Sequence, residues 1–255
     1  MDIEGKTFLV TGANSGLGAG VTNRLATGGA NVLGLDVNTD NATAFSDRYR
    51  DRVQLIKADV TSDKDGAAAI AHARHLFKGV NGLVNCAGIA PGQKIVGRSG
   101  AHDLDLFARA VSINLIGTFN MMRLAAEAMQ KNDPNPEGER GVIVNTASVA
   151  AYEGQIGQAA YAASKGGVVS LTLPAARELA RSGIRVMTIA PGIFETPMMA
   201  GLPQEVQDSL GAKVPFPPRL GRAEEFADLV TAICANPMLN GEVIRLDGAL
   251  RMTAN

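Results

Sequence analysis

Three side chains in the second half of this 255-residue chain have the types and spacing for proton transfer at an oxygen-bearing carbon. Tyr161 and Lys165 lie four residues apart, so on a helix they project from the same face. A phenol with its ordinary pKa of about 10 is a poor base at neutral pH, and a nearby ammonium favours the phenolate. Ser148 follows an apolar run and can hydrogen-bond a substrate oxygen as charge develops on it. The set predicts general acid–base catalysis by Tyr161, assisted by Lys165.

An isolated Tyr-x-x-x-Lys pair can also be a solvated surface contact of little energy. The small residues around this pair, Ala159-Ala160 and Ala162-Ala163, argue against that alternative because they leave a helix face open to a ligand. Asn114 lies within a predicted helix over Leu104–Gln130. We expect it to hold a water molecule that contacts Lys165.

A glycine-rich turn near the N-terminus is suited to hold the other reactant. It follows the apolar run Thr7–Val10 and precedes a helical pattern from Leu17 to Thr27. Glycine lets a pyrophosphate approach the helix N-terminus, where free N–H groups and the helix dipole favour an anion. A generic strand–helix turn is the alternative, and the place of the turn after the first strand favours a dinucleotide site. The expected cofactor contacts in the turn are Gly12, Ser15, Gly16, Leu17 and Gly18.

Asp36 ends the second predicted strand, about 20 residues after the glycines, where an acidic side chain bonds the adenosine ribose of a dinucleotide. A carboxylate accepts from both ribose hydroxyls and repels a 2′-phosphate. Val37 follows Asp36, and residues 12–18 contain no Lys or Arg, so the cation that an NADP site requires is missing from both places. The sequence therefore predicts NAD as the cofactor.

Short polar and small residues also follow the third and fourth predicted strands. Their groups lie at the carboxyl edge of the sheet, where they can bond the adenine or support the central strands. Simple turn residues are the alternative. The candidates are Asp59, Val60, Asn85, Ala87 and Gly88.

Apolar runs and helical patterns alternate along the whole chain. The runs are continuously apolar, as expected for a parallel sheet covered on both faces; they are Thr7–Val10, Val32–Leu35, Val53–Ile56, Leu83–Asn85, Val142–Asn145, Val186–Ile189 and Val243–Leu246. The helical patterns cover Leu17–Thr27, Asp65–Phe77, Leu104–Gln130, Ala159–Leu179 and Ala223–Ala235. The alternation predicts one α/β domain over residues 1–255, a Rossmann-type doubly wound parallel sheet with helices on both faces. Residues 1–90 would mainly bind the dinucleotide, 104–190 would carry the catalytic groups, and the proline-rich residues 192–222 would form a substrate lid.

Composition argues against several other classes of protein. The 24 Lys and Arg residues balance 25 Asp and Glu residues, so nothing draws the chain electrostatically to nucleic acid or to a membrane surface. No apolar run is long enough to span a bilayer, and the segment Met1–Lys6 resembles neither a signal nor a transit peptide. Two cysteines are too few for a disulfide framework, and three histidines lack metal-ligand spacing. We expect a cytoplasmic protein with no metal and no nucleic-acid or membrane partner.

Taken together, the motifs resemble the short-chain dehydrogenase/reductase family over essentially the whole length of the chain. The matching pieces are Thr11-Gly12-x-x-x-Gly16-x-Gly18, Asn85-Cys86-Ala87-Gly88, Asn114, Ser148, Tyr161-x-x-x-Lys165 and Pro191-Gly192. The resemblance implies a tetrad of Asn114, Ser148, Tyr161 and Lys165, with Lys165 also on the nicotinamide ribose, and a homotetramer. It adds Pro191, Ile193 and Thr196 as cofactor contacts, with Thr196 on the nicotinamide carboxamide.

Long runs in the second half are similar to one branch of the family, the type-2 3-hydroxyacyl-CoA dehydrogenases, also called 17β-hydroxysteroid dehydrogenases type 10. The runs cover residues 145–155, 183–192, 214–217 and 240–249. This resemblance implies NAD-dependent oxidation of an L-3-hydroxyacyl-CoA to a 3-oxoacyl-CoA, a step of fatty acid metabolism. The chain departs from the pattern around Pro91–Asp103 and at Glu195, so a hydroxysteroid or another bulky alcohol stays an alternative substrate. A non-catalytic NAD-binding scaffold in a complex is the alternative of another class. The expected substrate contacts are Gln158, Phe194, Met198, Met199 and Leu202.

Two further expectations concern the CoA nucleotide and the assembly. The cations available for CoA phosphates are Lys94, Arg98, Lys213 and Arg219, each with a solvated surface charge as the alternative. Leu250 and Met252 lie in the C-terminal stretch, which would pack between subunits by family resemblance. Docking of this stretch on its own subunit is the alternative.

Overall fold

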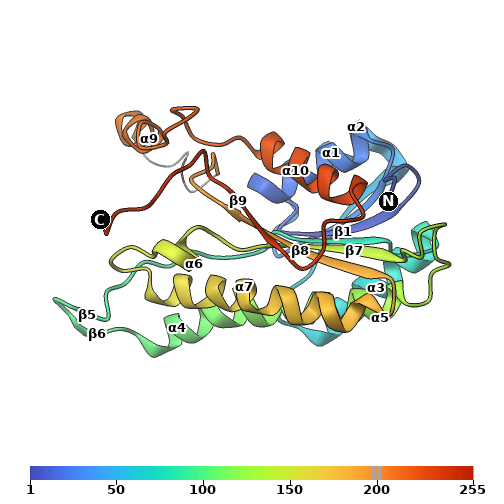
Figure 1. Ribbon diagram of the computed structural model, residues 1–255, viewed down its shortest axis with the longest axis horizontal. Helices are drawn as coiled ribbons and strands as arrows, with labels where there is room; N and C mark the ends of the chain where they lie inside the picture. The colour runs from blue at the N-terminus through green and yellow to red at the C-terminus, as the bar shows by residue number, and fades with distance from the viewer. Residues whose placement is uncertain (197–198, 200–202, 255) are drawn as a thin grey trace.

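The computed structural model describes residues 1–196, 199 and 203–254. Seven parallel strands form one sheet in the order β3-β2-β1-β4-β7-β8-β9 (Figure 1). All seven expected strands are confirmed, with ends within two residues of those predicted: β1 Thr7–Thr11, β2 Asn31–Asp36, β3 Val53–Lys57, β4 Gly82–Asn85, β7 Gly141–Thr146, β8 Ile184–Pro191 and β9 Val243–Leu246. The strand order reverses between β1 and β4, which opens a crevice at their carboxyl ends where ligands of such sheets bind.

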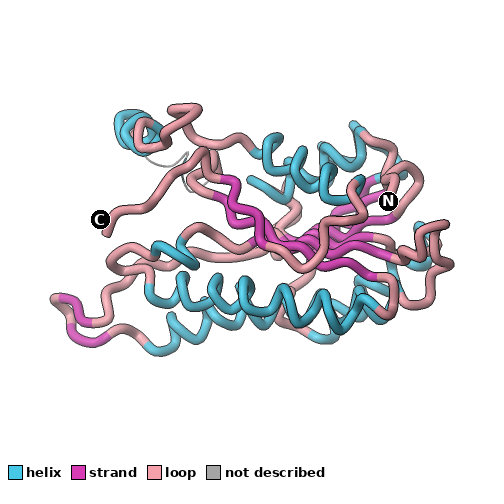
Figure 2. Tube along the Cα trace, in the orientation of Figure 1, coloured by secondary structure: helices cyan, strands magenta, loops and turns pink. Residues whose placement is uncertain are grey.

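Helices cover both faces of the sheet (Figures 1 and 2). One face packs against α1 Gly16–Thr27, α2 Ala42–Tyr49 and α10 Ala223–Ala235, and the other against α3 Asp63–Phe77, α5 Thr118–Met129 and α7 Ala159–Ala180. Successive strand residues serve opposite cores because their side chains alternate: Phe8 and Val10 lie in the first core and Leu9 in the second. The expectation of a doubly wound α/β sheet is confirmed.

The helix expected over Leu104–Gln130 is divided into three parts. They are α4 Leu104–Val111, a π-helical turn η2 Ser112–Gly117, and α5. Several short elements were not predicted: α2, the 3₁₀ turn η1 Arg50–Arg52, α6 Ala150–Glu153, α9 Gln204–Gly211, and the hairpin of β5 Val96–Gly97 and β6 Gly100–Ala101. Each spans eight residues or fewer, too few for a clear hydrophobic period. The hairpin projects from one end of the molecule (Figure 1).

Candidate active site

A cavity of about 1090 Å³ opens at the carboxyl edge of the sheet. Residues at or just after the carboxyl ends of five different strands line it: Gly12, Asp36, Ala87, Ser148 and Gly192. Its volume is at the top of the roughly 300–1,000 Å³ typical of ligand pockets. One cavity thus contains both the glycine-rich turn and the Tyr161–Lys165 pair, which the sequence predicted to act together.

The glycine-rich turn is packed too closely for larger side chains. Gly12 has a φ of +65°, and a Cβ there would lie 2.8 Å from the backbone nitrogen of Ala87. A Cβ at Gly18 would overlap the carbonyl oxygen of Gly12. Ser15 is the N-cap of α1 but forms no capping bond with its side chain, and the first turn holds no acidic residue. The free N–H groups of this turn and the Ser15 hydroxyl therefore fit an anionic group such as a pyrophosphate.

Asp36 is held by two backbone donors beside the glycine-rich turn. Its Oδ2 accepts from the backbone nitrogen of Asn14 at 3.0 Å, and its Oδ1 accepts from that of Asn38 at 3.1 Å. The carboxylate is half-buried and lines the cavity, whereas the neighbouring Val37 is 64% exposed. Free lone pairs of the carboxylate can accept ribose hydroxyls, as expected from the sequence.

The candidates after β3 and β4 differ in their positions. Asp59 and Val60 line the cavity, and Asp59 Oδ1 also accepts from the backbone nitrogen and the hydroxyl of Thr61, at 2.9 and 2.8 Å. Asn85 is not among the described residues that line the cavity. Its Nδ2 donates to Asn145 Oδ1 at 2.9 Å, which joins β4 to β7. Asn85 therefore supports the central strands, as one of its two expected roles.

The expected catalytic side chains Ser148, Tyr161 and Lys165 line the same part of the cavity. Ser148 follows β7, and its Oγ accepts from the backbone nitrogen of Ala150 at 3.1 Å. Tyr161 and Lys165 project from the first turns of α7, with Lys165 Nζ 5.9 Å from the centroid of the Tyr161 ring. Lys165 Nζ donates to the carbonyl oxygen of Thr146 at 2.7 Å, which fixes the ammonium between α7 and β7.

Burial dominates the pKa values in this part of the cavity. It raises the pKa of Tyr161, and a hydrogen bond with Ser148 opposes the rise. It lowers the pKa of Lys165 to about 8. In this structure burial moves the pKa of Tyr161 in the opposite direction to the lowering expected from Lys165, and the Lys165 ammonium donates to Thr146. Ser148 is the residue that favours the phenolate here.

Asn114 is fully buried in η2, at the interruption of the long helix. Its side chain exchanges two bonds of 2.8 Å with the backbone of Ile89 and donates to Ser164 Oγ at 2.9 Å. It does not line the cavity, but a Cβ at Gly88 would lie 3.0 Å from Asn114 Oδ1 and 3.5 Å from Lys165 Nζ. Asn114 Oδ1 and Lys165 Nζ therefore both lie close to Gly88. π-Helical turns such as η2 frequently occur at functional sites.

The expected cofactor residues that line the cavity beside those already described are Gly16, Leu17, Gly88, Pro191, Ile193 and Thr196. Among the expected substrate residues, Gln158, Phe194 and Met199 line it, whereas Met198 and Leu202 lie outside the described residues. Phe194 is 7% exposed and stacks edge to face on Phe226 with centroids 6.4 Å apart, so it also belongs to the core.

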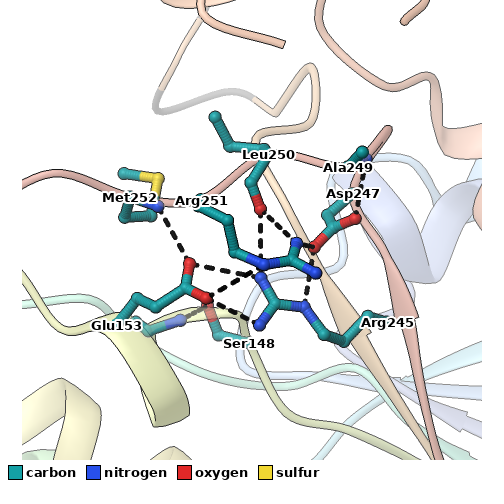
Figure 3. A network of polar contacts seen from close by, with 9 residues as sticks. Ser148, Glu153, Arg245, Asp247, Ala249, Leu250, Arg251 and Met252 are labelled. Carbon is teal, nitrogen blue, oxygen red and sulfur yellow. Dashed lines mark hydrogen bonds and ion pairs between the residues drawn. The ribbon is translucent and has the colours of Figure 1, made fainter. Parts of the chain in front are cut away.

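Sequence reasoning missed cavity residues from three late or short elements: Gln155, Leu210 and Met252. Met252 comes from the C-terminal tail, which a network of ion pairs holds against α6 (Figure 3). No local sequence motif could predict this contact, because Met252 and its partner Glu153 are 99 residues apart in the chain. Leu250 in the same tail is only 2% exposed within this one chain, which agrees with the alternative of docking on its own subunit.

The four cations considered for CoA phosphates do not line the cavity. Arg219 donates to Glu225 at 2.9 Å and is therefore engaged, while Lys94, Arg98 and Lys213 are exposed. Within the described residues, no three His, Cys, Asp or Glu side chains are placed to hold a metal ion. None of the helices in the described part combines the length and apolarity that a membrane span needs.

The strand order, the glycine-rich turn and the Ser148–Tyr161–Lys165 arrangement define a nicotinamide-dependent dehydrogenase. Residues 6–207 match the family model for short chain dehydrogenases. The chain is 51% identical to a 3-hydroxyacyl-CoA dehydrogenase type-2 of Drosophila melanogaster and 52% identical to that of Bos taurus, over 98% of its length and 99% and 97% of theirs. It shares 41% identity and a TM-score of 0.94 with the crystal structure of 3-hydroxyacyl-CoA dehydrogenase type-2 from Mycobacterium avium, over 98% of both chains. The protein belongs to the short-chain dehydrogenase family, whose members use NAD or NADP.

Proposed function

We propose that this protein uses NAD to oxidise an L-3-hydroxyacyl-CoA to the 3-oxoacyl-CoA. The observation that carries the proposal is one cavity with the glycine-rich turn and Asp36 in its cofactor part and Ser148, Tyr161 and Lys165 in its catalytic part. The relatives that match almost the whole chain at about half identity carry the name of this activity.

The residues present fit a dinucleotide. The N-terminus of α1 with Ser15 suits the pyrophosphate, and Asp36 suits the adenosine ribose. Thr196, which accepts from the backbone nitrogen of Met199 at 3.4 Å, is proposed to contact the carboxamide. A bound nicotinamide supplies the two-electron acceptor of the reaction. The carboxylate of Asp36 is the reason for preferring NAD to NADP.

Proton transfer is assigned to Tyr161. In oxidation, its phenolate oxygen accepts the proton of the substrate hydroxyl while Ser148 hydrogen-bonds the same substrate oxygen. Lys165 stays near the phenol by its bond to Thr146 and is proposed to orient the nicotinamide ribose. Asn114 holds η2 against α7 through Ser164 and completes the path for the proton beside Lys165.

A homotetramer in the cytoplasm remains part of the proposal. Large apolar side chains on η2, α5 and α7 support self-association: Ile116, Phe119 and Leu173 are 53%, 47% and 44% exposed. Leu250 does not support it, because its own chain already buries this side chain. The balanced charge of the chain agrees with the absence of a nucleic-acid partner.

The test is NADH formation from a panel of 3-hydroxyacyl-CoAs, hydroxysteroids and short secondary alcohols. We expect the thioesters to give the highest kcat/KM, since binding of the remote CoA positions the reacting carbon. A higher kcat/KM for steroids would show that the proposed substrate is wrong, whereas the proposed reaction, NAD-dependent oxidation of a secondary alcohol, would stand. Binding of NAD without turnover of any alcohol would favour a non-catalytic scaffold.

A further inference from the structure

The C-terminal tail after β9 reaches the catalytic part of the cavity. Met252 lines the cavity together with Gln155 and Gln158. The two residues after Met252 run along the loop that follows α6. Gln155 Nε2 donates to the carbonyl oxygen of Thr253 at 3.2 Å, and the backbone nitrogen of Ile156 donates to the carbonyl oxygen of Ala254 at 2.9 Å. The tail thus forms part of the wall near Ser148, although it is the last segment of the chain.

One carboxylate holds this tail in place. Glu153, the last residue of α6, accepts from Arg245 Nη1 and Nη2 at 2.8 and 3.2 Å and from the backbone nitrogen of Met252 at 2.9 Å (Figure 3). Arg251 Nε lies 3.5 Å from the same carboxylate. The bidentate contact is the strong form of an arginine–carboxylate pair, and both side chains are less than 25% exposed, Arg245 at 24% and Glu153 at 21%.

A second carboxylate shapes the turn that leads the tail to Glu153. Asp247 Oδ2 accepts from Arg245 Nε at 2.8 Å and from Arg251 Nη1 at 3.1 Å, and its Oδ1 accepts from the backbone nitrogen of Ala249 at 3.0 Å. Ala249 has a φ of +66°, a conformation that a residue other than glycine adopts only when its surroundings impose it. The buried Leu250 completes the anchor. Two arginines and two carboxylates balance, so the network adds no net charge beside the cavity.

Glu153 also belongs to the short segment that carries Ser148, residues 148–153. Helix α6 starts two residues after Ser148, and the backbone nitrogen of Ala150 donates to Ser148 Oγ. A single short segment therefore carries the serine at one end and the anchor of the tail at the other. Met252 is an unbranched, adaptable apolar side chain, suited to contact an alkyl chain or ring of varied shape.

We propose that Met252 is a specificity-determining residue for the apolar part of the substrate, and that Glu153 is the positioning residue that fixes it there. This inference rests on the proposed dehydrogenase function, because it assigns the substrate part of the same cavity. The ligand class is an alcohol with an apolar extension, such as the acyl chain of a 3-hydroxyacyl thioester.

The first experiment changes the wall. Met252→Ala removes the side chain beyond Cβ, so long or branched acyl chains gain room while a four-carbon chain loses little. We expect the ratio of kcat/KM for a long-chain to that for a four-carbon 3-hydroxyacyl-CoA to rise by about tenfold, the scale of discrimination in an apolar pocket. Met238→Ala, at a methionine that is 88% exposed, is the matched control and leaves the ratio unchanged. An unchanged ratio in Met252→Ala overturns the assignment of Met252.

The second experiment releases the anchor and needs no substrate. In Glu153→Ala, we expect hydrogen exchange of the Met252 amide and trypsin cleavage after Arg251 to accelerate, with the chain-length preference shifting in the same direction as in Met252→Ala. Glu127→Ala is the control, since that carboxylate is 69% exposed and contacts only Lys131 among the ion pairs of the described residues. Unchanged exchange and cleavage in Glu153→Ala overturn the anchoring role. If the unmodified protein oxidises steroids but no thioester, the proposed substrate is refuted and the role of Met252 is still testable. The size preference of Met252→Ala is then measured with a series of steroids of rising size.

Discussion

Replacing Asp36 with alanine tests which dinucleotide the cavity takes. The carboxylate is half-buried beside the glycine-rich turn and already accepts from two backbone nitrogens, of Asn14 and Asn38. These bonds hold it in place, so a 2′-phosphate on the adenosine ribose could not be accommodated by simple rotation of the side chain. The variant removes both the attraction for ribose hydroxyls and the repulsion of a phosphate.

The size of the effect follows from the exposure of the site. Two charges about 4 Å apart repel by about 1 kcal/mol in water and about 4 kcal/mol near a protein surface. A half-buried carboxylate lies between these limits, so the parent should prefer NAD over NADP by about five- to a thousandfold, at 1.4 kcal/mol per factor of ten. A hydrogen bond to a charged group contributes about 1.5–3 kcal/mol, so Asp36→Ala should weaken NAD by roughly ten- to a hundredfold. The backbone donors freed by the substitution can bond water at this open edge.

The assay is kcat/KM for NAD and for NADP with one alcohol substrate, in the parent protein, in Asp36→Ala and in Asp40→Ala. Asp40 is exposed, accepts from Asn38 Nδ2 at 2.9 Å and does not line the cavity, so its variant controls for the loss of one negative charge nearby. A parent that uses both dinucleotides equally would refute the reasoning. So would an Asp36→Ala variant that keeps the parent's ratio.

Four further predictions concern the site and the assembly. Tyr161→Phe should lower kcat by roughly 10²–10⁴-fold with little change in NAD affinity, measured by stopped-flow or fluorescence titration, and near-parental turnover would contradict a proton-transfer role. Because burial holds the pKa of Tyr161 above its ordinary value of about 10, alcohol oxidation, which needs the phenolate, should accelerate as pH rises through neutrality, while ketone reduction, which needs the phenol, should stay nearly constant there; an oxidation rate that levels off near neutral pH would contradict the raised pKa. Changing Lys94 and Arg98 together to Gln should raise KM for acetoacetyl-CoA and leave KM for a small uncharged ketone unchanged. If the variant and the unmodified protein have the same KM for acetoacetyl-CoA, both residues are solvated surface charges without a role in CoA binding. Light scattering at micromolar concentration should give the mass of a tetramer, and a monomer would remove that part of the proposal.

The residues proposed for the cofactor could be predicted to lie together because they come at or just after the ends of strands. Each apolar run of the sequence became a strand, and a parallel sheet places the residues after such strands at one edge. Gly12, Asp36 and Ala87 therefore line one cavity although they come from three separate strands. Asp36 and Asn85 are each the last residue of a strand, but the Asn85 side chain donates to Asn145 of the next strand and does not line the cavity.

Other features depend on contacts that no local pattern reveals. The sequence Ser112–Gly117 is compatible with an ordinary helix, and the π-helical turn accompanies the bonds of Asn114 to Ile89 and Ser164. The raised pKa of Tyr161 depends on its burial in the finished fold, whereas the spacing to Lys165 alone suggested the opposite shift. Neither result could be derived from residue types and intervals.

The two parts of the cavity are therefore built by different means, and this difference bears on substrate choice. The cofactor part rests on the strands and on glycines whose neighbours leave no room for change. The proposed substrate part is lined by residues near α6 and by the tail, and ion pairs of Arg245 on β9 with Glu153 and Asp247 hold the tail. Substitutions in the tail can alter the wall at Met252 without moving Tyr161 or Lys165, which are fixed on α7. In this architecture the sheet edge and α7 hold the proposed cofactor and catalytic residues, and we expect the range of alcohols to change through residues that follow the last strand.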